Sequence, residues 1–119
     1  MTTITDEYMQ GMLAKTKPYT IVLLKAGPKA DNPQKMKAED ADFRRIIWEH
    51  GRRNFALREE GVLSIVAPVT AEADVLGLYI FNTDAEAALK ILSEDPAVQA
   101  GIFVCQAYPC LSFPGDKLA

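Results

Sequence analysis

The sequence has few cysteines, few histidines and no long apolar runs, and each shortage excludes a class of protein. No apolar segment approaches the roughly 18 residues that a membrane helix requires, so no membrane association is expected. Two cysteines, Cys105 and Cys110, and a single histidine predict neither a disulfide framework nor a metal site. No phosphate-binding loop or glycine-rich dinucleotide motif is present, so no cofactor is expected.

Positive charge is also not in excess. The chain has 13 basic and 16 acidic residues and a formal net charge of −3, which argues against a general nucleic-acid binder. Its 119 residues suffice for one domain with a real core. The first ten residues include two acidic residues and no basic stretch, which differs from a secretory signal. We therefore expect a cytoplasmic protein with free thiols.

Hydrophobic periodicity and turn residues predict four strands and two principal helices. The strands are expected at residues 19–26, 62–69, 75–81 and 102–108. The first helix is expected at 38–60, ended by Gly61, and the second begins at a Thr83–Glu86 capping box and runs to about 93. Asp95 and Pro96 resemble the N-cap and first residue of one further helical turn.

The order of these elements is typical of an α+β, ferredoxin-like βαββαβ fold, in which both helices pack on one face of a four-stranded antiparallel sheet. This domain is expected at residues 18–109, after an N-terminal extension (1–17) with a short helix and before a C-terminal arm (110–119). A polar loop is expected at 29–37. We expect the second and third strands to lie between the first and the fourth.

The helix-free face of this sheet should be polar if it meets water, but the first, third and fourth strands are apolar on both faces. Two helices cannot cover both faces. We therefore expect a second copy of the chain to pack sheet on sheet against the first, as a homodimer or a higher oligomer.

The long helix contains the residues best suited to chemistry. At about 100° per residue, His50 and Asn54 lie in one stripe that faces the sheet. The imidazole could serve as a general acid or base, with Asn54 orienting it, or it could be a satisfied core residue. All five arginines are on this helix; they could form a solvated face, or one of them, Arg53, could bind a substrate anion.

A second stripe on this helix contains Trp48, Gly51 and Phe55. These residues point away from the sheet-facing stripe. We therefore expect the N-terminal segment or the C-terminal arm to cover Trp48 and Phe55.

Four stretches of the chain resemble the YCII-related family of small dimeric α/β-barrel proteins with a ferredoxin-like protomer. They are YTIVLLKAGP, His50 in the long helix, EEGVLSIVAPV and SEDPAVQAGIF. The resemblance covers about residues 18–109 and implies that His50 and Asp95 form an active-site pair. With the second and third strands between the first and the fourth, Asp95 reaches His50 only if the turn before the last strand carries it over the end of the long helix.

Three functions are compatible with these residues. The first is a cofactor-independent enzyme that isomerises or eliminates from a small organic acid, with His50 and Asp95 as catalytic residues and Arg53 and Asn54 binding the substrate. The second is a non-catalytic domain that encloses a small apolar molecule. The third is a structural dimer without a pocket. An enclosed polar cleft would favour the first function, and a mainly apolar pocket with a backbone-bonded His50 would favour the second.

Overall fold

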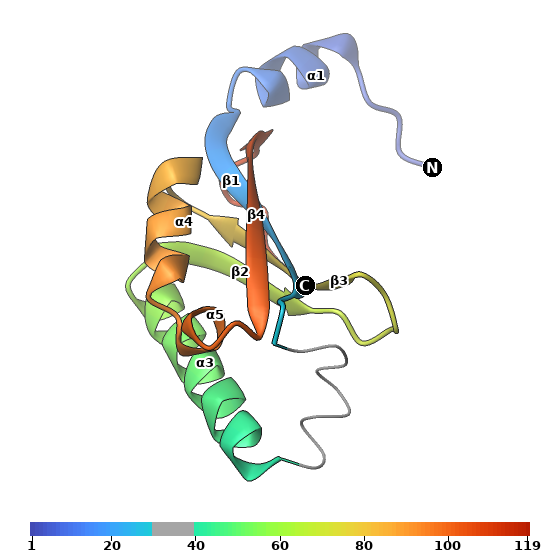
Figure 1. Ribbon diagram of the computed structural model, residues 1–119. Coiled ribbons are helices and arrows are strands. Elements are labelled where there is room, and N and C mark those ends of the chain that lie inside the picture. Colours follow the sequence, from blue (N-terminus) through green and yellow to red (C-terminus); the bar gives the residue numbers. More distant parts are fainter. Residues whose placement is uncertain (30–39) are drawn as a thin grey trace.

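The computed structural model describes residues 1–29 and 40–119 and consists of one sheet with helices (Figure 1). The elements in chain order are α1 (Asp6–Leu13), β1 (Lys17–Ala26), α3 (Ala41–Glu59), β2 (Leu63–Pro68), β3 (Val75–Phe81), α4 (Ala85–Ser93), α5 (Pro96–Gln99) and β4 (Phe103–Ser112). The predicted start of the long helix at 38, and nearly all of the predicted loop at 29–37, lie outside the described residues. No helix among the described residues is long and apolar enough to cross a membrane.

The four strands form one antiparallel sheet in the order β2-β3-β1-β4, with the longer helices packed on one face (Figure 1). The predicted α+β architecture is confirmed, and its strand order is consistent with a ferredoxin-like fold. The expectation that the second and third strands separate the first from the fourth is wrong, because β4 pairs directly with β1. The connection from β1 to β2 through α3 passes over β3, and the connection from β3 to β4 through α4 and α5 passes over β1. Strand β1 therefore lies between β3 and β4.

Two local predictions need correction. Helix α4 has Asp84 as its N-cap instead of Thr83, because the Asp84 carboxylate accepts the Ala87 N–H at 2.7 Å. The Thr83 carbonyl instead accepts the Thr20 hydroxyl of β1, at 2.6 Å. Strand β4 continues to Ser112, into the segment expected to be an arm. Pro109 fits within it because β4 is an edge strand, where one N–H is not needed for pairing.

The core lies between the sheet and the helices. Val22 of β1, Phe81 of β3 and Leu92 of α4 are almost completely buried there. Because strand side chains alternate between faces, the neighbours of these strand residues point to the other side of the sheet.

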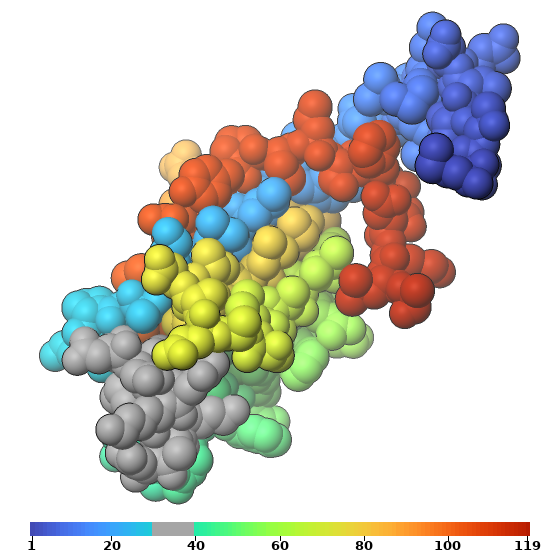
Figure 2. Space-filling model, turned by 90° about the vertical axis from the view of Figure 1, so that its right-hand side faces the viewer, coloured from blue at the N-terminus to red at the C-terminus, as the bar shows by residue number. Residues whose placement is uncertain are grey.

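The other face is the one that the sequence pattern marked as apolar. Ile21 and Leu23 of β1 stand beside Ile80 and Leu78 of β3 and remain only partly buried. Figure 2 looks onto this face, on which β4, β1, β3 and β2 lie side by side; Figure 1 shows the helices on the other side of the sheet. Among residues 1–29 and 40–119, no second layer covers this apolar face.

Gly27 and Gly101 meet where β1 ends and β4 begins. The Ile102 carbonyl accepts the Gly27 N–H at 2.7 Å, and the Gly101 carbonyl accepts the Lys29 N–H at 2.9 Å. A Cβ on Gly27 would overlap the Gly101 carbonyl oxygen, whereas a Cβ on Gly51 of α3 would meet nothing within 4 Å. The close backbone approach therefore requires a glycine at position 27, whereas position 51 has room for a side chain.

We expect Gly27→Ala to lower the free energy of unfolding by about 1–3 kcal/mol, because the added methyl group overpacks this junction. The matched control Gly51→Ala should leave the stability unchanged or raise it by up to about 1 kcal/mol, through helix propensity. Urea denaturation followed by circular dichroism measures both values. Equal stability of the two variants would contradict this account.

Candidate functional site

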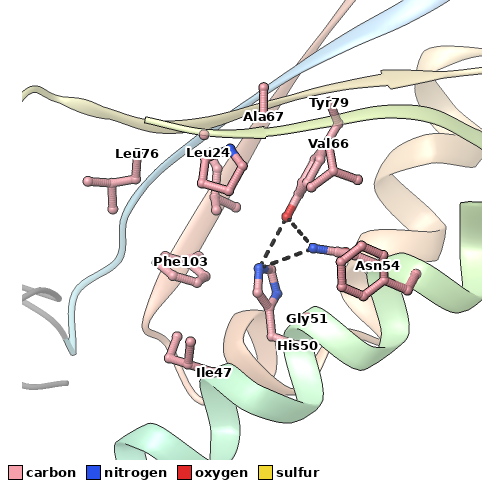
Figure 3. A pocket seen from close by; sticks show the side chains of 13 residues that line it. Leu24, Ile47, His50, Gly51, Asn54, Val66, Ala67, Leu76, Tyr79 and Phe103 are labelled. Carbon is pink, nitrogen blue, oxygen red and sulfur yellow. Dashed lines mark hydrogen bonds between the residues drawn. The ribbon is translucent and has the colours of Figure 1, made fainter. Parts of the chain in front are cut away.

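A cavity of about 330 Å³ lies between α3 and the ends of the strands that face it (Figure 3). Two of the lining residues, Gly51 of α3 and Gly77 of β3, are glycines and contribute no side chain to fill it. The other lining residues are Leu24, Ile47, His50, Asn54, Phe55, Val66, Ala67, Pro68, Leu76, Tyr79 and Phe103. The walls are therefore mostly apolar, with one polar corner.

His50 and Asp95 meet beside this corner. The His50 Nδ1 atom lies 2.8 Å from Asp95 Oδ2, although the two residues are 45 positions apart in the chain. Helix α3 presents His50 toward the sheet, as its helical phase predicted, and Asp95 is the N-cap of α5. Asp95 is completely buried and does not line the cavity, so it lies behind the imidazole.

The Asp95 carboxylate accepts three hydrogen bonds that decide its charge, from His50 Nδ1 and from the Ala97 and Val98 N–H groups. Burial by itself would raise the pKa of Asp95, but the hydrogen bond and charge of His50 outweigh it, together with the backbone N–H groups of Ala97 and Val98. The pKa of Asp95 is consequently below its ordinary value. Because an ionised carboxylate only accepts hydrogen bonds, His50 Nδ1 carries a proton and donates it.

The other ring nitrogen of His50 faces Tyr79 and Asn54 (Figure 3). The Tyr79 hydroxyl lies 3.2 Å from His50 Nε2, and Asn54 Nδ2 lies 3.2 Å from that hydroxyl and 3.4 Å from Nε2. In the neutral imidazole Nε2 is an acceptor, so the Tyr79 O–H donates to it while the Asn54 amide donates to the Tyr79 oxygen. Burial raises the pKa of Tyr79, which keeps the phenol protonated.

Tyr79 is a site residue that the sequence did not indicate. It lies in the apolar alternation of β3 and resembles an ordinary core aromatic residue. A usable signal was the hydroxyl of Tyr79 in an otherwise apolar strand. Such a hydroxyl needs a hydrogen-bond partner when it is buried, and His50 and Asn54 were predicted to face the same sheet.

Arg53 lies apart from the cavity. Its Nη2 atom donates to the Ile91 carbonyl of α4 at 2.7 Å and lies 3.7 Å from the Glu94 carboxylate. Arg53 is not among the residues that line the cavity. The structure thus brings His50, Asp95 and Asn54 together and directs Arg53 toward the end of α4.

Trp48 and Phe55 also differ from expectation. Trp48 is 70% exposed and Phe55 is 60% exposed, so the prediction that a terminal extension of the same chain covers them is wrong. Helix α1 lies beyond the opposite end of the sheet (Figure 1), because β1 extends away from it before reaching the cavity. Phe55 instead forms part of the cavity wall.

The two cysteines are free thiols. Burial, and secondarily the negative charge of Asp95, raise the pKa of Cys105 to about 11, which opposes formation of a nucleophilic thiolate. Among the described residues, no group of three or more His, Cys, Asp or Glu side chains is placed to hold a metal ion.

No family model matches the chain, and no curated protein matches it. The resemblance to the YCII-related family therefore stays a prediction based on the motifs quoted above.

The low pKa of Asp95 has a consequence for stability. The carboxylate stabilises the folded chain at pH values above its ordinary pKa of about 3.9, and this stabilisation is lost as the pH falls through the lower folded-state pKa. We expect Asp95→Asn to lower the free energy of unfolding at pH 7 by about 1–3 kcal/mol, because the hydrogen bond from His50 loses its charged acceptor.

Urea denaturation between pH 7 and pH 2 tests this prediction. The acid-dependent loss of stability should be smaller in Asp95→Asn than in the wild type. Asp84→Asn is the matched control, since Asp84 caps α4 in the same way but has no histidine partner among the interactions described. Parallel pH profiles for the wild type and Asp95→Asn would contradict the prediction.

Proposed function

We propose that the chain is a cofactor-independent enzyme that moves a proton on a small organic acid, with His50 and Asp95 as its working pair. The observation that carries the proposal is the 2.8 Å contact between His50 Nδ1 and a fully buried Asp95, placed behind the polar corner of an apolar cavity. The YCII-related resemblance supports the same pair. This geometry suits a histidine that gains and loses a proton.

His50 would act through Nε2, the nitrogen on the cavity side. Nε2 would take a proton from a substrate carbon and return it to a neighbouring carbon or to a leaving group. Asp95 would orient the ring through Nδ1–H and stabilise the imidazolium formed when Nε2 is protonated. Asp95 is therefore a positioning residue, since it does not reach the cavity.

Tyr79, held in place by Asn54, would donate a hydrogen bond to the carbonyl oxygen of the substrate. A substrate that loses a proton next to a carbonyl develops negative charge on the carbonyl oxygen, and a neutral phenol is a suitable donor to it. The raised pKa of Tyr79 keeps that proton in place. Asn54 donates to the Tyr79 oxygen and holds the hydroxyl near His50.

The cavity limits the substrate. Its volume of about 330 Å³ has room for roughly ten non-hydrogen atoms, taking about 30 Å³ for each. Among the described residues, no arginine or lysine contributes to its lining, so apolar contact and the oxygen-binding corner would supply most of the recognition.

A deuterium-exchange experiment tests the proposed activity. Small unsaturated carboxylic acids and keto acids are incubated with the protein in D2O, and loss of their acidic C–H signals is followed by proton NMR. We expect the wild type to accelerate exchange of at least one compound. His50→Gln should reduce the rate by at least about 100-fold through loss of the base, and Tyr79→Phe by about 100-fold through loss of the oxygen-binding donor.

The exposed Lys90→Gln variant on α4 is the control and should exchange at the wild-type rate. Chemical-shift changes at the lining residues show separately whether each compound binds. Binding without exchange by any compound would overturn the enzymatic proposal.

That outcome would favour the second candidate, a non-catalytic domain that binds a small molecule. The specific observation in its favour is that the cavity is mainly apolar and that Asp95 does not line it. Against it, His50 bonds to a carboxylate instead of to the backbone. The purely structural reading predicted no pocket beyond a solvent-sized void, and the cavity is much larger than that.

We also propose that two copies pack their open sheet faces together in a homodimer, the protomers of a dimeric α/β barrel. The apolar rows on β1 and β3 support this arrangement, because burial of such a face against its equivalent removes it from water. The free thiols of Cys105 and Cys110 fit a reducing, cytoplasmic compartment.

Sedimentation at low micromolar concentration should give about twice the mass of the 13.1 kDa chain. Leu23→Lys should shift the protein toward monomer, because it places a charge on the open face. The control Leu89→Lys changes an exposed leucine on the helix side and should leave the dimer intact. A monodisperse wild-type monomer would contradict the dimer.

A further inference from the structure

Helix α1 has an apolar side that lacks cover. Tyr8, Met9, Met12 and Leu13 lie along one side of it, and Tyr8, Met9 and Leu13 are 54%, 48% and 56% exposed. None of its residues is buried. A helix of eight residues is marginal in water on its own, so packing against another surface is required to stabilise it.

A matching uncovered surface lies on the outer side of α3. Trp48 and Phe55 are largely exposed, and Gly51 between them leaves open space where a Cβ would stand. Gly51 and Phe55 also line the cavity, and the neighbouring lining residue Pro68 is exposed at the surface. A helix laid across this surface would contact both aromatic rings and cover the cavity opening.

The two surfaces have complementary charge. Helix α1 contains Asp6 and Glu7 in its first turn and no basic residue in its last turn. Apart from Arg53, which points to α4, helix α3 contains four arginines against three acidic residues, and the Arg58 guanidinium lies 5.4 Å from the centre of the Phe55 ring. Opposite charges on two apolar surfaces favour their association and select its orientation.

Helix α1 of the same chain is poorly placed to reach the surface formed by Trp48 and Phe55. From Lys17, where α1 joins the sheet, to Leu24 at the cavity, β1 spans about 23 Å at roughly 3.3 Å per residue. The three-residue link spans at most about 10 Å, and the middle of α1 lies about 6 Å from its end. Figures 1 and 2 show α1 projecting beyond the opposite end of the sheet.

We propose that α1 of one copy packs across Trp48 and Phe55 of a second copy and closes the opening of that copy's cavity. Each cavity is then completed by the other chain, in the manner of an exchanged terminal element. The proposal concerns the enclosure of the cavity and holds whether the cavity is catalytic or only binds a ligand.

Trp48 reports this contact directly, because it is the only tryptophan of the chain. A full-length variant with Tyr8, Met9 and Leu13 changed to serine keeps Trp48 but loses the apolar side of α1. We expect its tryptophan emission to lie at longer wavelength than that of the wild type, with stronger acrylamide quenching.

A mixing experiment identifies which chain supplies the helix. The serine variant is refolded together with an excess of full-length Trp48→Phe, which has an intact α1 and no tryptophan. In mixed dimers only α1 of the other chain can cover Trp48, so the emission should shift back toward the wild-type wavelength.

Two results would overturn the proposal. Identical emission from the wild type and the serine variant would show that α1 does not cover Trp48. A difference that mixing does not restore would show that α1 covers Trp48 of its own chain.

The charge contribution is tested by Glu7→Lys at low salt. We expect this variant to need a several-fold higher protein concentration to reach the wild-type emission, because it removes attraction to the arginines of α3. The control Asp116→Lys makes the same charge change in the C-terminal segment and should behave as the wild type. Equal behaviour of the two variants would overturn the charge-guided contact.

Discussion

The contact between His50 and Asp95 is the constraint on which the rest of the site depends. A completely buried carboxylate is unfavourable unless its oxygens are paired, and the paired groups here come from α3 and from the start of α5. The hydrogen bond therefore fixes the position of the long helix relative to the turn that leads into β4. It also fixes the tautomer of His50 and leaves Nε2 toward the cavity.

The cavity is lined in part by small residues from α3 and from the strands. Gly51 on α3 and Gly77 on β3 remove side-chain volume where the helix crosses the strand ends, and the pairing of His50 keeps α3 in place. Its walls are apolar except where Tyr79 and Asn54 surround Nε2. A low-polarity space next to a fixed hydrogen-bond network strengthens the electrostatic interactions made there.

The outer surfaces of the chain carry exposed apolar side chains in three places. The open face of the sheet and the outer stripe of α3 both present apolar side chains that the single chain leaves uncovered, and α1 does the same. Uncovered apolar surface on three separate elements is unfavourable in water, and association of copies is the simplest way to remove it. Phe55 belongs to both the outer stripe and the cavity wall, so the proposed assembly would also affect the cavity.

The sequence by itself determined the element order, the apolar character of both sheet faces, the sheet-facing phase of His50 and Asn54, and Asp95 as an N-cap, since these depend on local periodicity and capping. Only the tertiary structure decided that β4 lies beside β1, that Tyr79 contacts the imidazole, and that Arg53 turns to the end of α4. Helical and strand periods specify which way a side chain points. Which distant surface it meets depends on how the strands pair and the helices pack, and no local pattern contains that information.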